Sequence, residues 1–346
     1  MLPQPITVSI EFVRGLLSAV RARHLPYEDW MWRAGMSPAL LEEEEARVTA
    51  EQYVILFHCV VEELDDEGLG FFSRPLRKGT FALLFRSILT SATLDVALQR
   101  LCRGFELLQQ DVRMHVTRDD GLTGLCVVIP PELDPGGVFL PESLLRAFFR
   151  LFDWLHGGRL TVVGFDFAYP KPSHASEYGK LFPGKIRFDQ RVSSMWMNSG
   201  DLLVPMYRDD AALRRFLAKF YRHIVIPQRN AHLAREQVRE YLLQASPRWP
   251  GLQQAADALK KPASTLQRQL ADEGTSFQVV KDTLRRDLAI VRLVTPDVPL
   301  SRIANELGFS DSAVFQRAFK SWTGSAPGTY RQQRLQPGHG SYPQTR

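Results

Sequence analysis

The chain has 346 residues, 45% of them hydrophobic, which is enough for two domains that each bury a core. No apolar run reaches the about eighteen residues of a membrane span, and the N-terminus lacks the features of a signal peptide, which indicates a cytoplasmic protein with no membrane contact. Residues 231–346 hold 16 Lys and Arg against 10 Asp and Glu, a net charge of +6 that leaves −1 for residues 1–230, so the last third is the part suited to a polyanion.

The apolar pattern of the first two thirds predicts an α+β domain. Residues 11–108 have apolar side chains at helical spacing. The runs VRMHVT and LTGLCVVIP alternate as in a β-hairpin, and Asp120-Gly121 between them suits its turn. A helix in PESLLRAFFRLFDWLHG and three strand-like runs follow: LTVVGFDFAY, KIRFD and SSMWMN. We therefore expect helices combined with an antiparallel sheet.

The stretch DDAALRRFLAKFYRHIV predicts an amphipathic helix with an apolar stripe. The stripe either packs on its own domain or joins two chains into a homodimer, and the sequence leaves both roles open. Its residues are Leu213, Phe216, Leu217, Phe220 and Tyr221. Because a proline and few apolar residues follow, we place a linker at 226–232, after a sensory or dimerisation domain at 1–225. An all-helical domain at 233–335 and a disordered tail at 336–346 complete the chain.

The stretch IANELGFSDSAVFQRAFKSWTG, residues 303–324, predicts two short helices joined by a tight turn, which is a helix-turn-helix. Gly308 lies at the turn, where glycine tolerates the left-handed backbone. We expect Ser310 to cap the second helix and Asp311 to favour its positive end. Once the apolar face is buried, a polar strip remains exposed. It consists of Ser312, Ala313, Gln316, Arg317 and Lys320. Amide and guanidinium groups can bond base edges and an ammonium can neutralise a phosphate, so the strip suits the DNA major groove.

The same pattern occurs 49 residues earlier, in STLQRQLA. Gln267 and Arg268 repeat the Gln-Arg pair, and Ser264 and Thr265 stand near the start of this helix. Between the two copies, TSFQVVKDTLRRDLAIVRLV predicts one long helix that joins two helix-turn-helix units. Recognition helices in successive major grooves would be about 34 Å apart. Two similar hairpins in an ordinary helical bundle are the alternative, but exposed residues have no packing reason to repeat.

Residues 303–331 resemble the signature of the AraC/XylS family of bacterial transcription regulators. The shared pattern is Ile-Ala, two variable residues, Leu-Gly-Phe-Ser-Asp, then Phe-x-Arg-x-Phe-Lys, Trp-Thr-Gly, Pro and Tyr-Arg. The resemblance implies that two recognition helices enter adjacent major grooves of double-stranded promoter DNA. It also implies an activator that contacts RNA polymerase and acts as a homodimer.

The first helix-turn-helix departs from this family pattern at its turn. Lys260-Lys261-Pro262 stand where the family has glycine, an apolar residue and a capping serine. A residue other than glycine in a left-handed turn costs about 1 kcal/mol, and proline offers no side-chain cap. We therefore expect the first unit to dock less tightly. Lys260, Lys261 and Ser310 are candidate phosphate contacts.

The first domain resembles the sensory domain named arabinose-binding-like, in RAGMSPALLEEEEARVTAEQYVILF and in YPKPSHASEYGKLFPGKIRFDQ. Members of that subgroup respond to varied small molecules, so a small-molecule effector is implied. Tyr169, His174 and Tyr178 are candidates to line its pocket as polar groups in an apolar cavity, although surface hydrogen bonding would also explain them. A first domain that only dimerises, with no effector, is the alternative.

The sequence gives little support for a catalytic function or for a bound cofactor. Cys59, Cys102 and Cys126 lie far apart, which fits reduced, buried thiols better than disulfides or a zinc site. Some members of the family carry DNA-repair activity through clustered cysteines, and this chain lacks such a cluster. His174 and Glu177 alone are a weak metal pair. Gly-x-Ser-x-Gly, P-loop and His-Glu-x-x-His motifs are absent. We expect no enzyme activity, no cofactor and no metal.

Overall fold

The computed structural model of the chain describes residues 6–335 except 136, 207, 226–232 and 296–297. These residues form two compact units. Unit 1 contains Met1–Ile10, Gly35–Gln52 and Arg229–Arg346, and unit 2 contains Glu11–Ala34 and Tyr53–Gln228. Two N-terminal segments thus group with the C-terminal helices, whereas the sequence predicts one continuous first domain. The predicted linker at 226–232 and tail at 336–346 lie outside the described residues.

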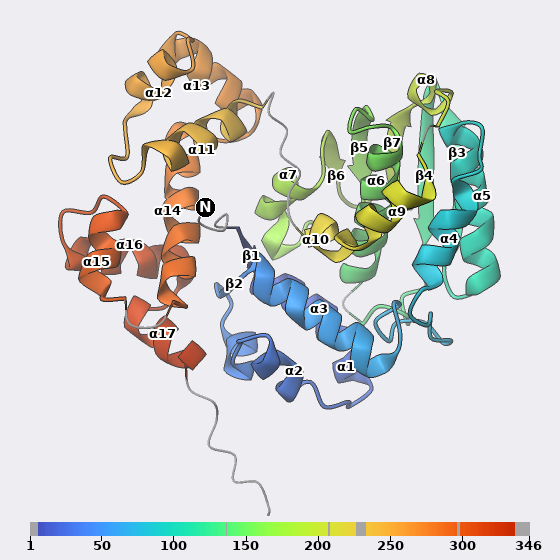
Figure 1. Cartoon of the computed structure of the whole chain (residues 1–346), viewed down its shortest axis with the longest axis horizontal. Coiled ribbons are helices and arrows are strands. Elements are labelled where there is room, and N and C mark those ends of the chain that lie inside the picture. The colour runs from blue at the N-terminus through green and yellow to red at the C-terminus, as the bar shows by residue number, and fades with distance from the viewer. Residues whose placement is uncertain (1–5, 136, 207, 226–232, 296–297, 336–346) are drawn as a thin grey trace, which may run out of the picture. The chain divides into compact units, whose positions relative to one another are not determined.

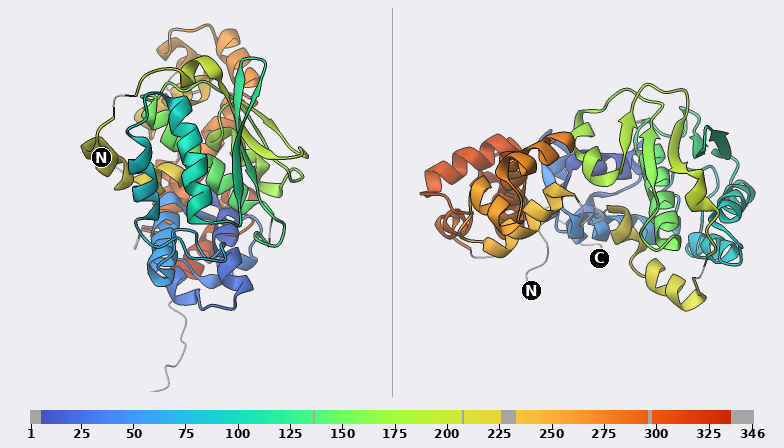
Figure 2. Two further views of the ribbon diagram at one scale, coloured as in Figure 1. Left: turned by 90° about the vertical axis from the view of Figure 1, so that its right-hand side faces the viewer. Right: turned by 90° about the horizontal axis from the view of Figure 1, so that it is seen from above.

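Unit 2 combines helices with a five-stranded sheet, in agreement with the predicted α+β class (Figure 1). The strand order is β3-β4-β7-β5-β6. The strands are β3 (Arg113–Asp119), β4 (Leu122–Val128), β5 (Val162–Asp166), β6 (Lys185–Arg187) and β7 (Ser193–Asn198). Helices α5 (Leu94–Leu108) and α6 (Phe139–Leu155) contact the sheet, and Figure 2 shows them on the same side of it.

Around α5 and α6, unit 2 has further helices, of which α4 and α8 contact α5 and α10 contacts α6. They are α1 (Ile10–Ala22) and α3 (Ala50–Leu64), whose first residues belong to unit 1, and α2 (Glu28–Arg33), α4 (Thr80–Ile88), α7 (Tyr178–Leu181), α8 (Ser199–Leu202), α9 (Asp210–Leu217) and α10 (Phe220–Val225), with the 3-10 helix η2 at Ser173–Glu177. Phenylalanines dominate the core, among them Phe85, Phe105, Phe148 and Phe165, all fully buried. The three cysteines are buried and unbridged.

The sheet agrees with the prediction in its hairpin and differs from it at one edge. Asp120 and Gly121 join β3 to β4 with positive φ angles of +38° and +74°, which suit a tight hairpin turn. At the other edge β5 and β6 are parallel, so the expectation of a wholly antiparallel sheet was wrong. The chain between them forms η2 and α7 and returns in the same direction, which a short hairpin turn cannot do.

The predicted helix over residues 209–225 is divided in two, α9 and α10. Its apolar stripe is turned into unit 2. Phe216 stacks on Trp154 with 4.6 Å between ring centroids, and Phe220 meets Phe85 edge-on at 5.2 Å. Leu213 is fully buried, and Tyr221 and Leu217 are half-buried. The stripe therefore packs on its own unit, and a role of these residues in a homodimer stays a prediction.

Unit 1 is helical apart from a two-stranded ribbon. Its helices are η1 (Pro38–Glu42), α11 (Ala234–Ala245), α12 (Leu252–Ala258), α13 (Ala263–Asp272), α14 (Phe277–Leu293), α15 (Leu300–Glu306), α16 (Ser312–Thr323) and α17 (Pro327–Leu335), and its ribbon is β1 (Thr7–Ser9) with β2 (Arg47–Thr49). In Figure 1, α14 runs between α12 and α13 on one side and α15 and α16 on the other. None of the helices in the described residues is long and apolar enough to span a membrane.

Candidate nucleic-acid interface and ligand pocket

Two pairs of short helices in unit 1 are built alike. Lys260 lies between α12 and α13 with a φ of +53°, and Gly308 lies between α15 and α16 with a φ of +71°. Both turns use the left-handed backbone that the sequence predicts there. Only glycine adopts it without strain, so the α12–α13 pair carries a conformational cost that the α15–α16 pair avoids.

The second helices of the pairs begin differently. Asp311 is the N-cap of α16, where its carboxylate accepts a hydrogen bond from the Val314 amide at 2.8 Å, and this bond lowers the pKa of Asp311. The predicted cap, Ser310, lies one residue too early and donates to Asp311 instead, at 3.4 Å. Pro262 occupies the corresponding place before α13 and makes no side-chain cap.

The Gln-Arg pair occupies the same register on α13 and α16. Gln267 and Arg268 are the fifth and sixth residues of α13, and Gln316 and Arg317 are the fifth and sixth of α16. All four side chains are exposed. On the opposite faces Leu266, Leu270, Phe315 and Phe319 are fully buried. The predicted polar strip is therefore the solvent face of each helix.

The other residues of the strip differ in how accessible they are. Ser264, Ala313 and Lys320 are exposed, whereas Thr265 and Ser312 are half-buried. Ser312 Oγ accepts a hydrogen bond from Gln316 at 3.3 Å. Within the described residues the side-chain cations of Arg268, Arg317 and Lys320 form no hydrogen bond or ion pair, so all three can meet an anion.

The two lysines of the first turn are also unlike each other. Lys260 is exposed. Lys261 is half-buried, and its ammonium donates at 2.9 Å to the side-chain oxygens of Gln237 and Gln269. Lys261 thus joins α11 to α13 inside unit 1. Of the three candidate phosphate contacts, Lys260 and Ser310 are exposed, whereas Lys261 is not.

One aromatic residue joins the two helix pairs to α14. Trp249 precedes α12, and its indole donates to the Glu306 carbonyl in α15 at 3.0 Å. The guanidinium of Arg285, on α14, lies 4.9 Å from the Trp249 ring and 5.0 Å from the Phe309 ring. Lys281, one turn earlier, donates to the Trp249 carbonyl at 2.8 Å. These contacts hold the pairs in one arrangement, which would fix the spacing of their exposed strips.

The N-terminal ribbon is part of the same unit. Thr7 of β1 donates to the Asp287 carboxylate of α14 at 2.6 Å, and both residues are buried. Arg47 of β2 donates to Thr7 Oγ1 at 2.9 Å, and its own carbonyl accepts a hydrogen bond from Tyr330 of α17. The sequence does not predict this network, because nothing near residue 7 or 47 indicates a contact with residues about 280 positions away.

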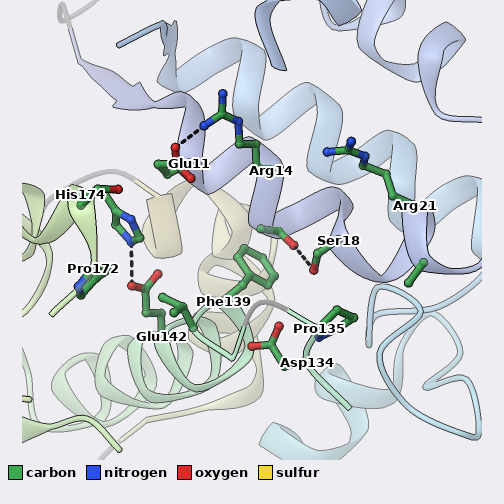
Figure 3. Close-up of a pocket in the computed structure, with 14 residues that line it drawn as sticks. Glu11, Arg14, Ser18, Arg21, Asp134, Pro135, Phe139, Glu142, Pro172 and His174 are labelled. Carbon is green, nitrogen blue, oxygen red and sulfur yellow. Dashed lines mark hydrogen bonds and ion pairs between the residues drawn. The ribbon is translucent and has the colours of Figure 1, made fainter. Parts of the chain in front are cut away.

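Unit 2 contains a pocket of about 650 Å³ (Figure 3). One wall is the polar face of α1, where Glu11, Arg14, Ser18 and Arg21 follow one another at helical spacing. The opposite wall comes from the start of α6 and the loop before it, with Asp134, Phe139 and Glu142, and His174 of η2 closes one end. Gly15 permits this approach, since a Cβ there would lie 2.6 Å from the Phe139 ring. The size lies within the usual range for small-molecule sites.

Glu142 brings the three predicted effector residues together. Its Oε1 accepts hydrogen bonds from Tyr178, from Tyr169 at 3.5 Å and from His174, whose Nε2 lies 2.9 Å away. Only His174 lines the pocket itself, and the two tyrosines are buried behind Glu142. Burial raises the pKa of Glu142, and the His174 bond opposes this shift. Burial also lowers the pKa of Arg146, one turn along α6, to about 9.

Several pocket residues are not predicted from the sequence. Glu142 interrupts the apolar stripe that continues through Leu145 and Phe149, and a lone acid on a buried face was the signal that could have revealed it. The polar face of α1 carried no such signal. From the sequence, Glu11, Arg14 and Arg21 are typical of an ordinary solvated helix face. The structure shows that α6 lies across the pocket from them.

Comparison with known proteins gives two family matches. Residues 25–206 match the family described as the arabinose-binding domain of AraC transcription regulator, N-terminal, and residues 255–333 match a helix-turn-helix domain. The first match covers about half of the chain, and it includes helix α6, which forms part of the pocket wall. The second begins within α12 and ends within α17, so it includes both exposed strips.

Two curated relatives match nearly the whole chain. The ornithine utilization regulator of Pseudomonas aeruginosa is 28% identical over 326 residues, which cover 94% of this chain and 96% of that one. An uncharacterised HTH-type transcriptional regulator of Mycobacterium tuberculosis is 26% identical over 360 residues, covering 95% and 98%. The crystal structure of the regulator CdpR from P. aeruginosa aligns over 94% of this chain and 99% of its own, at 21% identity with a TM-score of 0.35, which is too low to support an argument.

Proposed function

Because the chain belongs to the AraC family of DNA-binding transcription regulators, we propose that its two helix pairs act together as two helix-turn-helix units on promoter DNA. We further propose that α13 and α16 are the recognition helices and that α14 sets the distance between them. By family likeness the outcome is activation through RNA polymerase, with two chains acting as a homodimer.

The shared register of the exposed Gln-Arg pairs carries this proposal. Glutamine can bond adenine through two hydrogen bonds, and arginine can do the same with guanine. At the fifth and sixth positions of α13 and α16 these side chains are exposed, while the residues that hold each helix in place are fully buried. We assign Lys320, one turn beyond Arg317 on the same helix, to a phosphate contact.

Regulation is assigned to unit 2. It carries the match to the arabinose-binding domain of AraC regulators and contains the pocket at α1 and α6. The relative named ornithine utilization regulator aligns along nearly the whole chain, so control by a small metabolite is the expected mode here too. We propose that a ligand in this pocket changes the promoter binding of unit 1.

Selection of sheared genomic DNA by the purified chain tests the DNA-binding proposal. Bound fragments should share two sequence elements about one helical turn apart, in keeping with two recognition helices in successive major grooves. The double variant Arg268→Ala/Arg317→Ala should lose the enrichment. Arg113→Ala/Lys219→Ala removes the same charge from exposed sites in unit 2 and should keep it. Equal loss in both double variants, or no enrichment either alone or with metabolite extract, would contradict sequence-specific binding.

A further inference from the structure

The pocket of unit 2 has an acidic end with an unused hydrogen-bonding atom. The Glu142 side chain is 5% exposed, and all three of its hydrogen-bonding neighbours contact Oε1. Within the described residues Oε2 has no hydrogen-bond partner, and Figure 3 shows the carboxyl group at the pocket wall below His174. Because Glu142 lines the pocket, this oxygen can accept a hydrogen bond from a donor that enters it.

The other end of the pocket is basic. Arg21 lies on the pocket face of α1, and Figure 3 shows its guanidinium away from Glu142, beyond Arg14 and Ser18. Arg21 is exposed, and its guanidinium lies 5.9 Å from the Tyr27 ring centroid. Among the described side chains it has no carboxylate partner, whereas Arg14 forms an ion pair with Glu11. Arg21 thus offers its donors to an anion that enters the pocket.

We propose that this pocket binds a zwitterion whose amino and carboxylate groups are separated by a carbon chain, such as an ω-amino acid, with its amino group on Glu142 and its carboxylate on Arg21. The proposal rests on the function assigned to unit 2 above and names the chemical class of its effector. An ammonium group supplies three donors where Oε2 lacks one, and a carboxylate can pair with the fork of a guanidinium. Phe139 and Val138 offer apolar contact to the carbon chain between the two charged ends.

Other ligand classes satisfy only part of this arrangement. A neutral sugar could donate to Glu142 but would leave Arg21 without a charged partner. A dicarboxylate would place one negative group beside Glu142, and a diamine would place a positive group beside Arg21, and like charges repel in such a confined site. Only a molecule with one charge of each sign matches both ends.

Calorimetric titration of the full-length chain separates these classes. The probes are α- and ω-amino acids with two to six carbons, each compared with the amine and the carboxylate that lack its other charged group, and with L-arabinose as a neutral polyol. We expect at least one amino acid to bind, and its two halves to bind about 10- to 100-fold more weakly, because each loses one charged hydrogen-bonding group.

Two variants test which protein side chain binds the amino group of the ligand and which binds its carboxylate. Glu142→Gln keeps the size of the side chain and should weaken binding of the amino acid far more than binding of its amine-free half. Arg21→Gln should show the opposite pattern, sparing the carboxylate-free half. Arg113→Gln, an exposed change on β3, should alter neither. Circular dichroism checks that each variant is folded.

The outcomes that overturn the proposal are distinct from failure of the DNA-binding proposal. Tight binding of arabinose, equal binding of one half and the whole amino acid, or no binding of any amino acid would each refute the zwitterion site. The DNA selection described above uses the wild-type chain, alone or with metabolite extract, and variants in α13 and α16, whereas the titration measures ligand binding in the absence of DNA. Failure of one experiment therefore does not imply failure of the other.

Discussion

The indole ring of Trp249 lies so close to Gly308 that a Cβ on the glycine would stand 2.5 Å from Cδ1 of the ring. Trp249 precedes α12 and Gly308 joins α15 to α16, so this contact links the two helix pairs. Gly308 also has a φ of +71°. The glycine of the second turn therefore serves both the backbone conformation and the contact between the pairs.

Gly308→Ala should lower the free energy of unfolding by about 1 kcal/mol for the left-handed backbone and by a further 1 to 3 kcal/mol for the overlap with Trp249. Urea denaturation of the full chain measures the sum. Gly274→Ala is a matched control, since Gly274 has a φ of +69° and a Cβ there would meet nothing within 4 Å. Equal losses in the two variants would show that the ring contact contributes nothing.

Arg317→Ala and Lys320→Ala should weaken DNA binding in different ways. If Arg317 reads a base, its loss should cost about 1 to 3 kcal/mol and relax sequence preference at one position. Loss of Lys320 should weaken binding to all sequences alike and reduce the slope of log affinity against log salt by about one. Fluorescence anisotropy over a salt series with operator and scrambled DNA distinguishes the two. The reverse pattern would mean that their roles are exchanged.

Lys260→Gly should stabilise unit 1. Lys260 has a φ of +53°, and glycine would relieve up to about 1 kcal/mol of backbone strain. Thermal or urea unfolding measures the gain. Lys260→Ala removes the same charge but keeps the strain, so it should give no increase. A gain of equal size in both variants would assign the effect to charge rather than to the backbone.

Thr7→Val should destabilise unit 1, although residue 7 is far in the sequence from the proposed recognition helices α13 and α16. The substitution keeps the shape of the side chain but removes the donor to the buried Asp287 carboxylate, which should cost about 1 to 3 kcal/mol. Unfolding monitored together with operator affinity provides the measurement. Thr329→Val, at an exposed position in α17, is the control. A wild-type unfolding curve for Thr7→Val would show that the ribbon does not support unit 1.

The stability of unit 2 should depend on pH through Glu142. Burial raises its pKa in the folded state, and the groups that face it are His174, Tyr169, Tyr178 and Arg146. A carboxyl with a raised pKa favours the folded state fully below its ordinary value of about 4.3, and this contribution is lost as pH rises through the raised value.

Glu142→Gln removes this titration. The difference in unfolding free energy between wild type and Glu142→Gln should therefore shift in favour of the wild type as the pH falls from neutrality through the raised pKa. Denaturation at a series of pH values gives the difference directly. A difference that stays constant over this range would mean that Glu142 keeps its ordinary pKa in the folded chain.

Much of unit 1 follows from local sequence. Gly308, the buried spacing of Phe315 and Phe319, and the stop at Gly324 define the α15–α16 pair within about twenty residues, because turn residues and helical periodicity act on near neighbours. The exposed register of Gln316 and Arg317 follows from the same periodicity. Even here the N-cap differs from the prediction by one residue, Asp311 instead of Ser310, since serine and aspartate are both good N-cap residues.

The tertiary structure decided what the polar faces meet. Periodicity shows that Arg14 and Arg21 share a polar face of α1, but not that Glu142, more than a hundred residues later, lies across a pocket from them. Periodicity likewise does not decide whether Phe216 packs within its own unit or against a second chain. The structure shows its ring stacked on Trp154 of the same unit. Contacts between distant segments depend on how whole elements pack. The sequence of a helix shows which face is apolar or polar, but not which element that face contacts. The sequence by itself determined the helix pairs and their exposed strips, whereas the pocket, the ribbon on α14 and the parallel strand pair exist only through long-range packing.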